Sequence, residues 1–428
     1  MNYKCYHIIT IGCQMNKSDS ERVSGFLSSH GLEAAKVDKA DIVIINTCGV
    51  RQSAEDRAYG LVKRVQQDNE RAKIVITGCL SKRKDVIKRL KYKVDLFLPI
   101  NELPNMFSLL AGKTGDVKDK IREIKGEEYL KIIPIYSNNF SAYVPIGNGC
   151  NNFCSYCVVP YARGREVYRP YSQIIDEVKG LVEKGFKEII LIAQNVNSYR
   201  YENKDFADLL LEVNALDGDF WICFFSSHPK DMSDKLIAAM GKADKLVKYL
   251  HLAVQSGDDE ILRKMNRKYK ADDYIKLIGK LRKTKKNISI TTDIIVGFPS
   301  ETKKQFKNTK KLLKKVKFDL AYVSQYSPRP GTASFNMKDD VSPEDKKIRE
   351  EKLLKILQKT SQKNNRKYLG QKLKVLVEGK NRRGRYFGKT NGYKTVKFNN
   401  DRNDLAGKFV EVKIIRYENF SLIGELID

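Results

Sequence analysis

Six of the eight cysteines follow predicted β-strands, and this placement constrains the fold more than any other feature of the sequence. Three lie close together and are called the loop trio: Cys150, Cys154 and Cys157. Three are far apart in the sequence and are called the sheet trio: Cys13, Cys48 and Cys79. The N-terminus lacks the pattern of a secretion signal, so we expect a cytoplasmic protein, where thiols stay reduced. Metal binding or redox chemistry is therefore favoured over disulfides.

The length of 428 residues predicts about two or three domains, each large enough to bury its own core. Hydrophobic residues make up 41% of the chain and charged residues 31%, which is typical of packed domains. No apolar run approaches the roughly 20 residues that a membrane helix needs, so we expect no membrane association.

Apolar runs alternate with helical patterns in the first part of the chain, which predicts an α/β fold. Strands are expected at residues 6–11, 41–45 and 73–76, and the amphipathic stretches between them indicate βαβ units in a doubly wound parallel sheet. Residues 111–128 are polar and without periodicity, which indicates a linker. We therefore expect an N-terminal domain over residues 1–118.

A second series of strands predicts a partial (β/α)6 barrel over residues 136–366. The expected strands are residues 142–146, 188–192, 220–225, 249–254, 289–296 and 320–325, followed by a polar helix over 343–368. The remaining strands, at 374–377, 395–398 and 410–415, are short and alternating, with Gly- and Asn-rich turns between them. They predict a small all-β barrel over residues 367–428.

The formal net charge of +28 favours a polyanionic partner, because contacts to phosphates release counterions. The C-terminal residues 361–428 contain 16 Lys and Arg against 7 Asp and Glu, a net charge of +9 suited to phosphate binding. The clusters Arg163-Gly164-Arg165 and Arg382-Arg383-Gly384-Arg385 are also suited to phosphate. A Lys-rich solvated surface is the alternative interpretation of the same composition.

The loop trio has the donor set of an iron-sulfur site with one open position. A 4Fe-4S cluster takes four ligands, so three cysteines leave one iron free to bind the amino and carboxylate groups of a small molecule. Zinc is the alternative, but a zinc site would need a fourth Cys or His near the loop. The sequence between Gly149 and Cys157 offers none.

The sheet trio is expected to converge, because the C-terminal ends of parallel strands share one edge of a sheet. Three thiols at that edge would form a second three-cysteine site with an open position. The alternative is that these cysteines pack as small hydrophobic residues at strand ends. Cys5 and Cys223 belong to neither group and are expected to pack within strands.

The spacing of the loop trio after the first barrel strand resembles the motif of the radical S-adenosylmethionine superfamily. Several strings along the whole chain resemble the tRNA methylthiotransferase family: Gln194-Asn195-Val196-Asn197-Ser198-Tyr199, Ser227-His228-Pro229, Val254-Gln255-Ser256-Gly257 and Ser327-Pro328-Arg329-Pro330-Gly331-Thr332. Within that family, Cys157-Val158-Val159-Pro160-Tyr161 is most similar to the MiaB-type branch. That branch adds a methylthio group to carbon 2 of isopentenylated adenosine at position 37, beside the tRNA anticodon. The C-terminal barrel resembles a TRAM domain, which is an RNA-binding module.

This resemblance implies two 4Fe-4S clusters and S-adenosylmethionine as cofactors. The loop trio would hold the cluster that cleaves S-adenosylmethionine to a radical, and the sheet trio an auxiliary cluster that handles sulfur. Gln194, Asn195 and Gly297 are the candidate S-adenosylmethionine contacts, although a glycine at a strand end is often only a turn residue. His228 is either a polar site residue or a structural histidine. The implied partners are a tRNA anticodon stem-loop and an electron-donor protein, with the chain as a monomer.

Two alternatives remain from the sequence. The chain could belong to another methylthiotransferase branch that acts on threonylcarbamoyl-adenosine or on a ribosomal protein. It could instead be a zinc-stabilised RNA-binding protein without catalysis. Nucleoside mass spectrometry separates the branches, and iron content separates an enzyme from a zinc-stabilised binder.

Overall fold

A five-stranded parallel sheet forms the N-terminal part of the chain, which a computed structural model describes over residues 3–112 and 128–427. The strands are β1 (Cys5–Thr10), β2 (Glu33–Ala34), β3 (Ile42–Thr47), β4 (Lys73–Gly78) and β5 (Leu96–Phe97), in the order β2-β1-β3-β4-β5. The helices are α1 (Gln14–Ser29), α2 (Gln52–Asp68), α3 (Lys84–Leu90) and α4 (Met106–Leu110). This order, with the first strand inside the sheet, is typical of doubly wound folds.

Alternate residues of β3 belong to different hydrophobic clusters, so both faces of the sheet are covered. Val43 and Ile45 pack with residues of α2 and α3, whereas Ile42 and Ile44 pack with residues of α1 and with Met106 of α4. Every residue of β3 is buried, as expected for a strand inside a parallel sheet. The predicted doubly wound domain is confirmed. Most of the predicted linker, residues 113–127, lies outside the described residues.

Six parallel strands form the central barrel: β6 (Ser141–Pro145), β9 (Glu188–Ile192), β12 (Trp221–Phe224), β13 (Tyr249–His251), β14 (Ser289–Val296) and β15 (Leu320–Gln325). They pair as two sheets, β12-β9-β6 and β13-β14-β15, which parallel bridges such as Ile222 to Leu246 connect. No pairing joins β6 to β15 among the described residues, so the barrel is open on one side. The predicted partial barrel is confirmed, except that β13 ends at His251 instead of continuing to residue 254.

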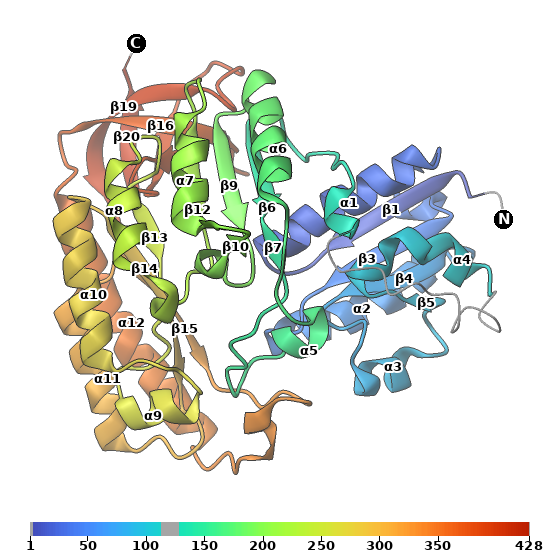
Figure 1. Cartoon of the computed structure of the whole chain (residues 1–428), viewed down its shortest axis with the longest axis horizontal. Coiled ribbons are helices and arrows are strands. Elements are labelled where there is room, and N and C mark those ends of the chain that lie inside the picture. Colours follow the sequence, from blue (N-terminus) through green and yellow to red (C-terminus); the bar gives the residue numbers. More distant parts are fainter. Residues whose placement is uncertain (1–2, 113–127, 428) are drawn as a thin grey trace.

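Helices surround the barrel on the outside (Figure 1). They are α5 (Val159–Arg163), α6 (Tyr171–Glu183), α7 (Phe206–Ala215), α8 (Asp234–Lys242), α9 (Asp259–Lys264), α10 (Ala271–Thr284), α11 (Lys303–Val316) and α12 (Pro343–Arg366). Four short strands lie in loops: β7 (Gly147–Asn148), β8 (Val167–Tyr168), β10 (Arg200–Tyr201) and β11 (Lys204–Asp205). Short 3-10 helices lie at Val37–Lys39, Ile100–Asn105, Glu128–Lys131, Val196–Ser198, Pro229–Asp231 and Ala333–Asn336.

The C-terminal strands close into a small barrel, as predicted. They are β16 (Lys372–Lys380), β17 (Tyr386–Thr390), β18 (Thr395–Asn399), β19 (Phe409–Tyr417) and β20 (Ser421–Leu426), in the order β16-β17-β18-β20-β19. The sequence pattern misses β17 and β20, because Gly388 and Gly424 interrupt their apolar alternation. Both glycines are required there, since a Cβ on Gly388 would lie 2.2 Å from the carbonyl oxygen of Leu376.

The small barrel covers the end of the central barrel at which the strands begin (Figure 1). One hydrophobic cluster contains residues of all three units, among them Met15, Trp221 and Leu376. At the interface Trp221 packs against Phe409, with ring centroids 4.7 Å apart. A membrane-spanning helix is not found among the described residues.

Candidate active site

The loop trio lies at the end of the central barrel opposite the small barrel. The chain leaves β6, passes through β7 and then forms the loop that contains the three cysteines before it enters α5. Ser155 anchors this loop to the C-terminal end of α9, because its backbone N–H donates to the Met265 carbonyl (3.1 Å) and its hydroxyl to the Lys264 carbonyl (2.8 Å). The cysteines are therefore held on the rest of the barrel instead of projecting into solvent.

Gly149, directly before Cys150, lets the loop turn back tightly on itself. Its φ is +84°, and a Cβ there would lie 2.0 Å from the Arg165 carbonyl oxygen. The Cys150 backbone N–H donates to the Gly164 carbonyl (3.1 Å), which closes the loop. Only glycine combines this backbone conformation with the available space.

Two of the loop thiols, Cys150 and Cys157, lie in surroundings that oppose their ionisation. Burial raises the pKa of Cys157 to about 12, and charge on Cys154 adds to that effect. Burial also raises the pKa of Cys150. All three are free cysteines. Since a metal binds the thiolate form and releases its proton, three such thiols without a disulfide partner fit the role of cluster ligands.

The sheet trio follows three neighbouring strands, as the sequence predicts. Cys48 and Cys79 come directly after β3 and β4, and Cys13 follows β1 closely. Because these strands pair in parallel as β1-β3-β4, the cysteines lie at one edge of the sheet. Cys48 and Cys79 are buried, whereas Cys13 is exposed.

The three sheet thiols lie near enough to influence one another. The pKa of Cys48 is raised to about 11 by burial and then by charge on Cys79 and Cys13. Although Cys13 has solvent-accessible surface, the protein packed around its thiol raises its pKa and Cys79 adds to this, while the Arg163 guanidinium opposes both. A Cβ on Gly12 would lie 2.7 Å from the Cβ of Cys48, so this glycine permits the close approach.

Within the described residues, no three Cys, His, Asp or Glu side chains are arranged to hold one metal ion. This finding concerns a single ion. In a 4Fe-4S cluster each thiolate binds a different iron, so the ligands stand farther apart than around one ion. The roles of both trios as ligands stay predictions at this point.

Buried polar atoms without a partner among the described residues surround the C-terminal ends of β9 and β12. They are the side-chain oxygens Gln194 Oε1, Asn195 Oδ1 and Ser227 Oγ, together with Arg267 Nε. Asn195 is 2% exposed, and its Nδ2 already donates to Asp231 (2.7 Å). Since buried polar atoms normally have a hydrogen-bond partner, this group fits a polar ligand such as S-adenosylmethionine.

Gly297 follows β14 with a φ of +68°, and its surroundings explain its identity without a ligand. A Cβ there would lie 2.3 Å from Cγ of Lys346. Its backbone N–H donates to Glu301 (2.8 Å). A contact between Gly297 and adenine stays a prediction.

His228 is placed as a structural histidine. Its ring nitrogen Nδ1 accepts a hydrogen bond from the Lys230 backbone N–H (3.2 Å), and the residue is 7% exposed. Burial lowers its pKa to about 2, with smaller effects from Arg267 and Lys230. Cys223 is fully buried in β12 and packs in the cluster shared by the three units, as expected.

Sequence analysis missed the position of Arg163, which was grouped with exposed phosphate-binding residues. Its side chain is 3% exposed and pairs with Asp19 of α1 at 2.5 Å. Asn16 and Asp19 lie three residues apart on α1, and that spacing alone does not indicate a partner. Both are buried, so they require a polar partner from elsewhere in the chain.

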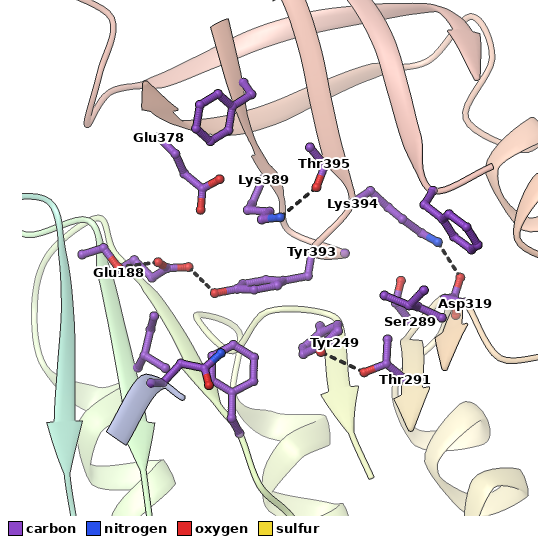
Figure 2. A pocket seen from close by; sticks show the side chains of 18 of the residues that line it. Glu188, Tyr249, Ser289, Thr291, Asp319, Glu378, Lys389, Tyr393, Lys394 and Thr395 are labelled. Carbon is purple, nitrogen blue, oxygen red and sulfur yellow. Dashed lines mark hydrogen bonds and ion pairs between the residues drawn. The ribbon is translucent and has the colours of Figure 1, made fainter. Parts of the chain in front are cut away.

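A cavity of about 490 Å³ lies where the three units meet. Its lining includes Gln14 of α1, directly after Cys13, as well as residues of the central barrel and the small barrel. Figure 2 shows Tyr393 in this cavity, where its hydroxyl donates to Glu188 (2.8 Å). The ring of Tyr393 stacks on Tyr249 with centroids 4.7 Å apart.

Family comparisons match the three units separately. Residues 5–99 match the uncharacterized protein family UPF0004, residues 144–313 the Radical SAM superfamily and residues 366–427 the TRAM domain. The central unit is therefore a radical S-adenosylmethionine barrel, a class that works with a 4Fe-4S cluster and S-adenosylmethionine.

Curated relatives resemble the chain over nearly its full length. The tRNA-2-methylthio-N(6)-dimethylallyladenosine synthase of Clostridium botulinum (strain Loch Maree / Type A3) is 42% identical, covering 99% of this chain and 97% of the relative. The synthase of Clostridium novyi (strain NT) is 41% identical, again covering 99% and 97%. The chain belongs to the tRNA-2-methylthio-N(6)-dimethylallyladenosine synthase family.

Solved structures share the fold at low sequence identity. The radical S-adenosylmethionine methyltransferase TsrM from Kitasatospora setae has a TM-score of 0.58 and 13% identity, covering 78% of this chain and 74% of TsrM. The cobalamin-dependent S-adenosylmethionine radical enzyme OxsB has a TM-score of 0.51 and 10% identity, with 78% and 54% covered. These similarities concern the fold alone.

Proposed function

We propose that the chain adds a methylthio group to carbon 2 of N6-dimethylallyl (isopentenyl) adenosine at position 37 of tRNA. The observation that carries this proposal is the 42% identity over 99% of the chain to relatives named for that reaction. The match to the TRAM domain and the net charge of +28 support a tRNA substrate.

The loop trio is proposed to hold the cluster that binds S-adenosylmethionine. That cluster supplies the electron that cleaves the sulfonium to methionine and a 5′-deoxyadenosyl radical, which can remove hydrogen from an unreactive carbon. The protein's part is to fix three thiolates and leave one iron open. The unpartnered oxygens of Gln194 and Asn195 support their assignment to cofactor binding. Gly297 is proposed as a further S-adenosylmethionine contact on the basis of the family resemblance.

The sheet trio is proposed to hold a second 4Fe-4S cluster, which would carry the sulfur of the methylthio group, and a second S-adenosylmethionine molecule would donate the methyl group. The effects of Cys79 on the pKa of Cys48 and on that of Cys13 support a common site. Cys13 is exposed, and the next residue lines the cavity where the three units meet.

We propose one function for each of three domains. Residues 1–118 would hold the auxiliary cluster, residues 136–366 would carry out the radical chemistry and residues 367–428 would bind RNA. The exposed turn between β16 and β17, with Arg382, Arg383 and Arg385, is suited to the phosphates of an anticodon stem-loop. Because cleavage of S-adenosylmethionine needs an electron, we also propose an electron-donor protein. Both trios come from one chain, which supports a monomer, and the tRNA substrate supports a cytoplasmic location.

Nucleoside mass spectrometry of tRNA tests the substrate. A strain without this gene should accumulate N6-dimethylallyladenosine and lack its 2-methylthio derivative, and the gene on a plasmid should restore it. In vitro, the iron-loaded protein should modify tRNA carrying dimethylallyladenosine but leave tRNA carrying threonylcarbamoyl-adenosine unchanged. Unaltered methylthio-dimethylallyladenosine in the deletion strain would contradict the proposal.

A further inference from the structure

We propose that Arg163 is a positioning residue that fixes the sheet trio relative to the loop trio and provides the positive charge beside the sheet trio. This inference rests on the proposed function, because it assumes that the sheet trio holds a cluster.

Arg163 belongs to the segment that follows the loop trio, but its guanidinium lies against the N-terminal domain. It ends α5, and its Nη2 reaches two side chains of α1, Asp19 (2.5 Å) and Asn16 (3.0 Å). Figure 1 shows α5 beside the N-terminal domain. Arg163 therefore crosses the boundary between the units that hold the two trios.

The same guanidinium also donates a hydrogen bond to a side chain in the segment that leads into the loop trio. Its Nη1 donates to Asn148 Oδ1 (3.1 Å), two residues before Cys150, and Asn148 Nδ2 donates back to the Arg163 carbonyl (3.4 Å). The Arg163 side chain is thus hydrogen-bonded to residues near both trios.

Asn16 carries the connection to the sheet trio itself. Its Oδ1 accepts a hydrogen bond from Arg163 and, while Cys13 carries its proton, one from the Cys13 thiol (3.6 Å), which is lost when Cys13 binds a cluster as thiolate. Its Nδ2 donates to the carbonyls of Ile11 (2.7 Å) and Thr47 (2.9 Å). These carbonyls lie where β1 and β3 lead into Cys13 and Cys48, so Asn16 ties two cysteines of the trio to Arg163.

The chemistry of this position requires arginine. The guanidinium satisfies three acceptors in one plane, which the single ammonium of lysine cannot reproduce. Asp19, with its side chain 1% exposed, offsets part of the charge. The guanidinium still lies close enough to Cys13 and Cys79 to favour an anionic cluster in the trio, and residues of this outer kind tune metal sites.

A simpler interpretation is that Arg163 only clamps two domains together, and Arg22 provides the matched control. Arg22 lies on α1 and, like Arg163 of α5, is buried. Its Nη2 pairs with Glu177 of the central barrel at 3.2 Å. Its contacts lie along the same interface, with Glu177 and the Ile132 carbonyl, away from both trios. Arg22→Lys therefore reports on clamping alone.

The test uses the full chain with the loop trio replaced by alanine, so that only the sheet trio can bind a cluster. Arg163→Lys and Arg22→Lys are made in this background, and iron retention against a chelator, reduction potential and thermal unfolding are measured. We expect Arg163→Lys to weaken iron retention about 10- to 100-fold and to shift the potential. Arg22→Lys should lower the unfolding temperature and leave iron retention and potential unchanged.

Two results would overturn the inference, and they are distinguishable. Equal iron retention and potential in Arg163→Lys and its parent would show that the residue only clamps the domains. Failure of the parent itself to bind iron would refute the auxiliary cluster of the proposed function, and the inference with it.

Discussion

The loop trio and the sheet trio offer the same three thiols but are built in opposite ways. The loop trio lies within residues 150–157, and one turn at Gly149 together with a few backbone hydrogen bonds brings its members together. The sheet trio spans residues 13–79 and exists only when β1, β3 and β4 are paired. A cluster site can therefore be encoded by a short segment or by the pairing of distant strands. The loop trio and the sheet trio should respond differently to equivalent substitutions.

Their electrostatic surroundings also differ. Beside the sheet trio, Arg163 opposes the effect of burial on the pKa of Cys13. In the loop trio, Glu166 adds to the effect of burial on the pKa of Cys150. The difference is one of position, because Arg267 likewise opposes burial at Cys157 and Asp19 adds to burial at Cys13.

The largest effect is expected from replacing the loop trio by alanine. Without these thiols S-adenosylmethionine cannot be cleaved, so both 5′-deoxyadenosine and modified tRNA should fall below detection. Iron should drop from about eight to about four per chain, since the sheet trio still forms. Chromatography of the reaction and iron analysis measure both results. Modified tRNA from this variant would refute the assignment of the two sites.

Replacing the sheet trio by alanine should separate the two activities. Cleavage of S-adenosylmethionine should continue, because the loop trio is intact, while methylthiolated tRNA should be lost. The ratio of 5′-deoxyadenosine to modified nucleoside is the measurement. If 5′-deoxyadenosine and the modified nucleoside are both lost, the loop trio needs an intact sheet trio in order to fold. The two sites would then not be independent.

The same contrast explains how much the sequence predicts. The three-part fold follows from strand and helix periodicity, and the loop trio is recognisable from spacing alone. The sheet trio follows from a general rule, that parallel strand ends share one edge. All of these are features in which residue type and spacing directly reflect geometry.

Contacts between distant segments could not be predicted. Arg163 and Asp19 are 144 residues apart, and nothing in either local pattern indicates the pairing. Tyr393 is also far in sequence from Glu188 and Tyr249, yet it enters the cavity at their side. Such contacts depend on how complete domains pack, which hydrophobic periodicity does not encode.

Glycines directly before cysteines provide a finer comparison of the two sites. Gly149 and Gly78 precede Cys150 and Cys79, and both have positive φ with carbonyl oxygens where a Cβ would lie. Gly149→Ala should lower iron at the loop trio and S-adenosylmethionine cleavage. Gly78→Ala should lower iron at the sheet trio and leave cleavage largely intact.

Gly185→Ala is the control for this pair. Gly185 has the same φ of +84° as Gly149, but no atom lies within 4 Å of an added Cβ. The Gly185→Ala substitution should lower the free energy of unfolding by about 1–2 kcal/mol, because alanine is strained at this φ, and should leave the iron content unchanged. Gly149→Ala should cost more, because the Arg165 carbonyl must also move. Equal iron content in all three variants would show that neither site depends on its glycine.

The smallest effect concerns His228, on the side of the loop trio. Its pKa of about 2 in the folded protein, against about 6.5 when unfolded, means that the unfolded chain binds one more proton below neutral pH. Its contribution to stability is therefore complete above about pH 6.5 and decreases by up to about 1.4 kcal/mol per pH unit as the pH falls below that value. Denaturant unfolding between pH 7 and 5 should show a shallower decline in His228→Asn than in the unaltered protein. A bell-shaped activity profile that disappears in His228→Asn would instead make His228 a proton-transfer group beside the loop trio.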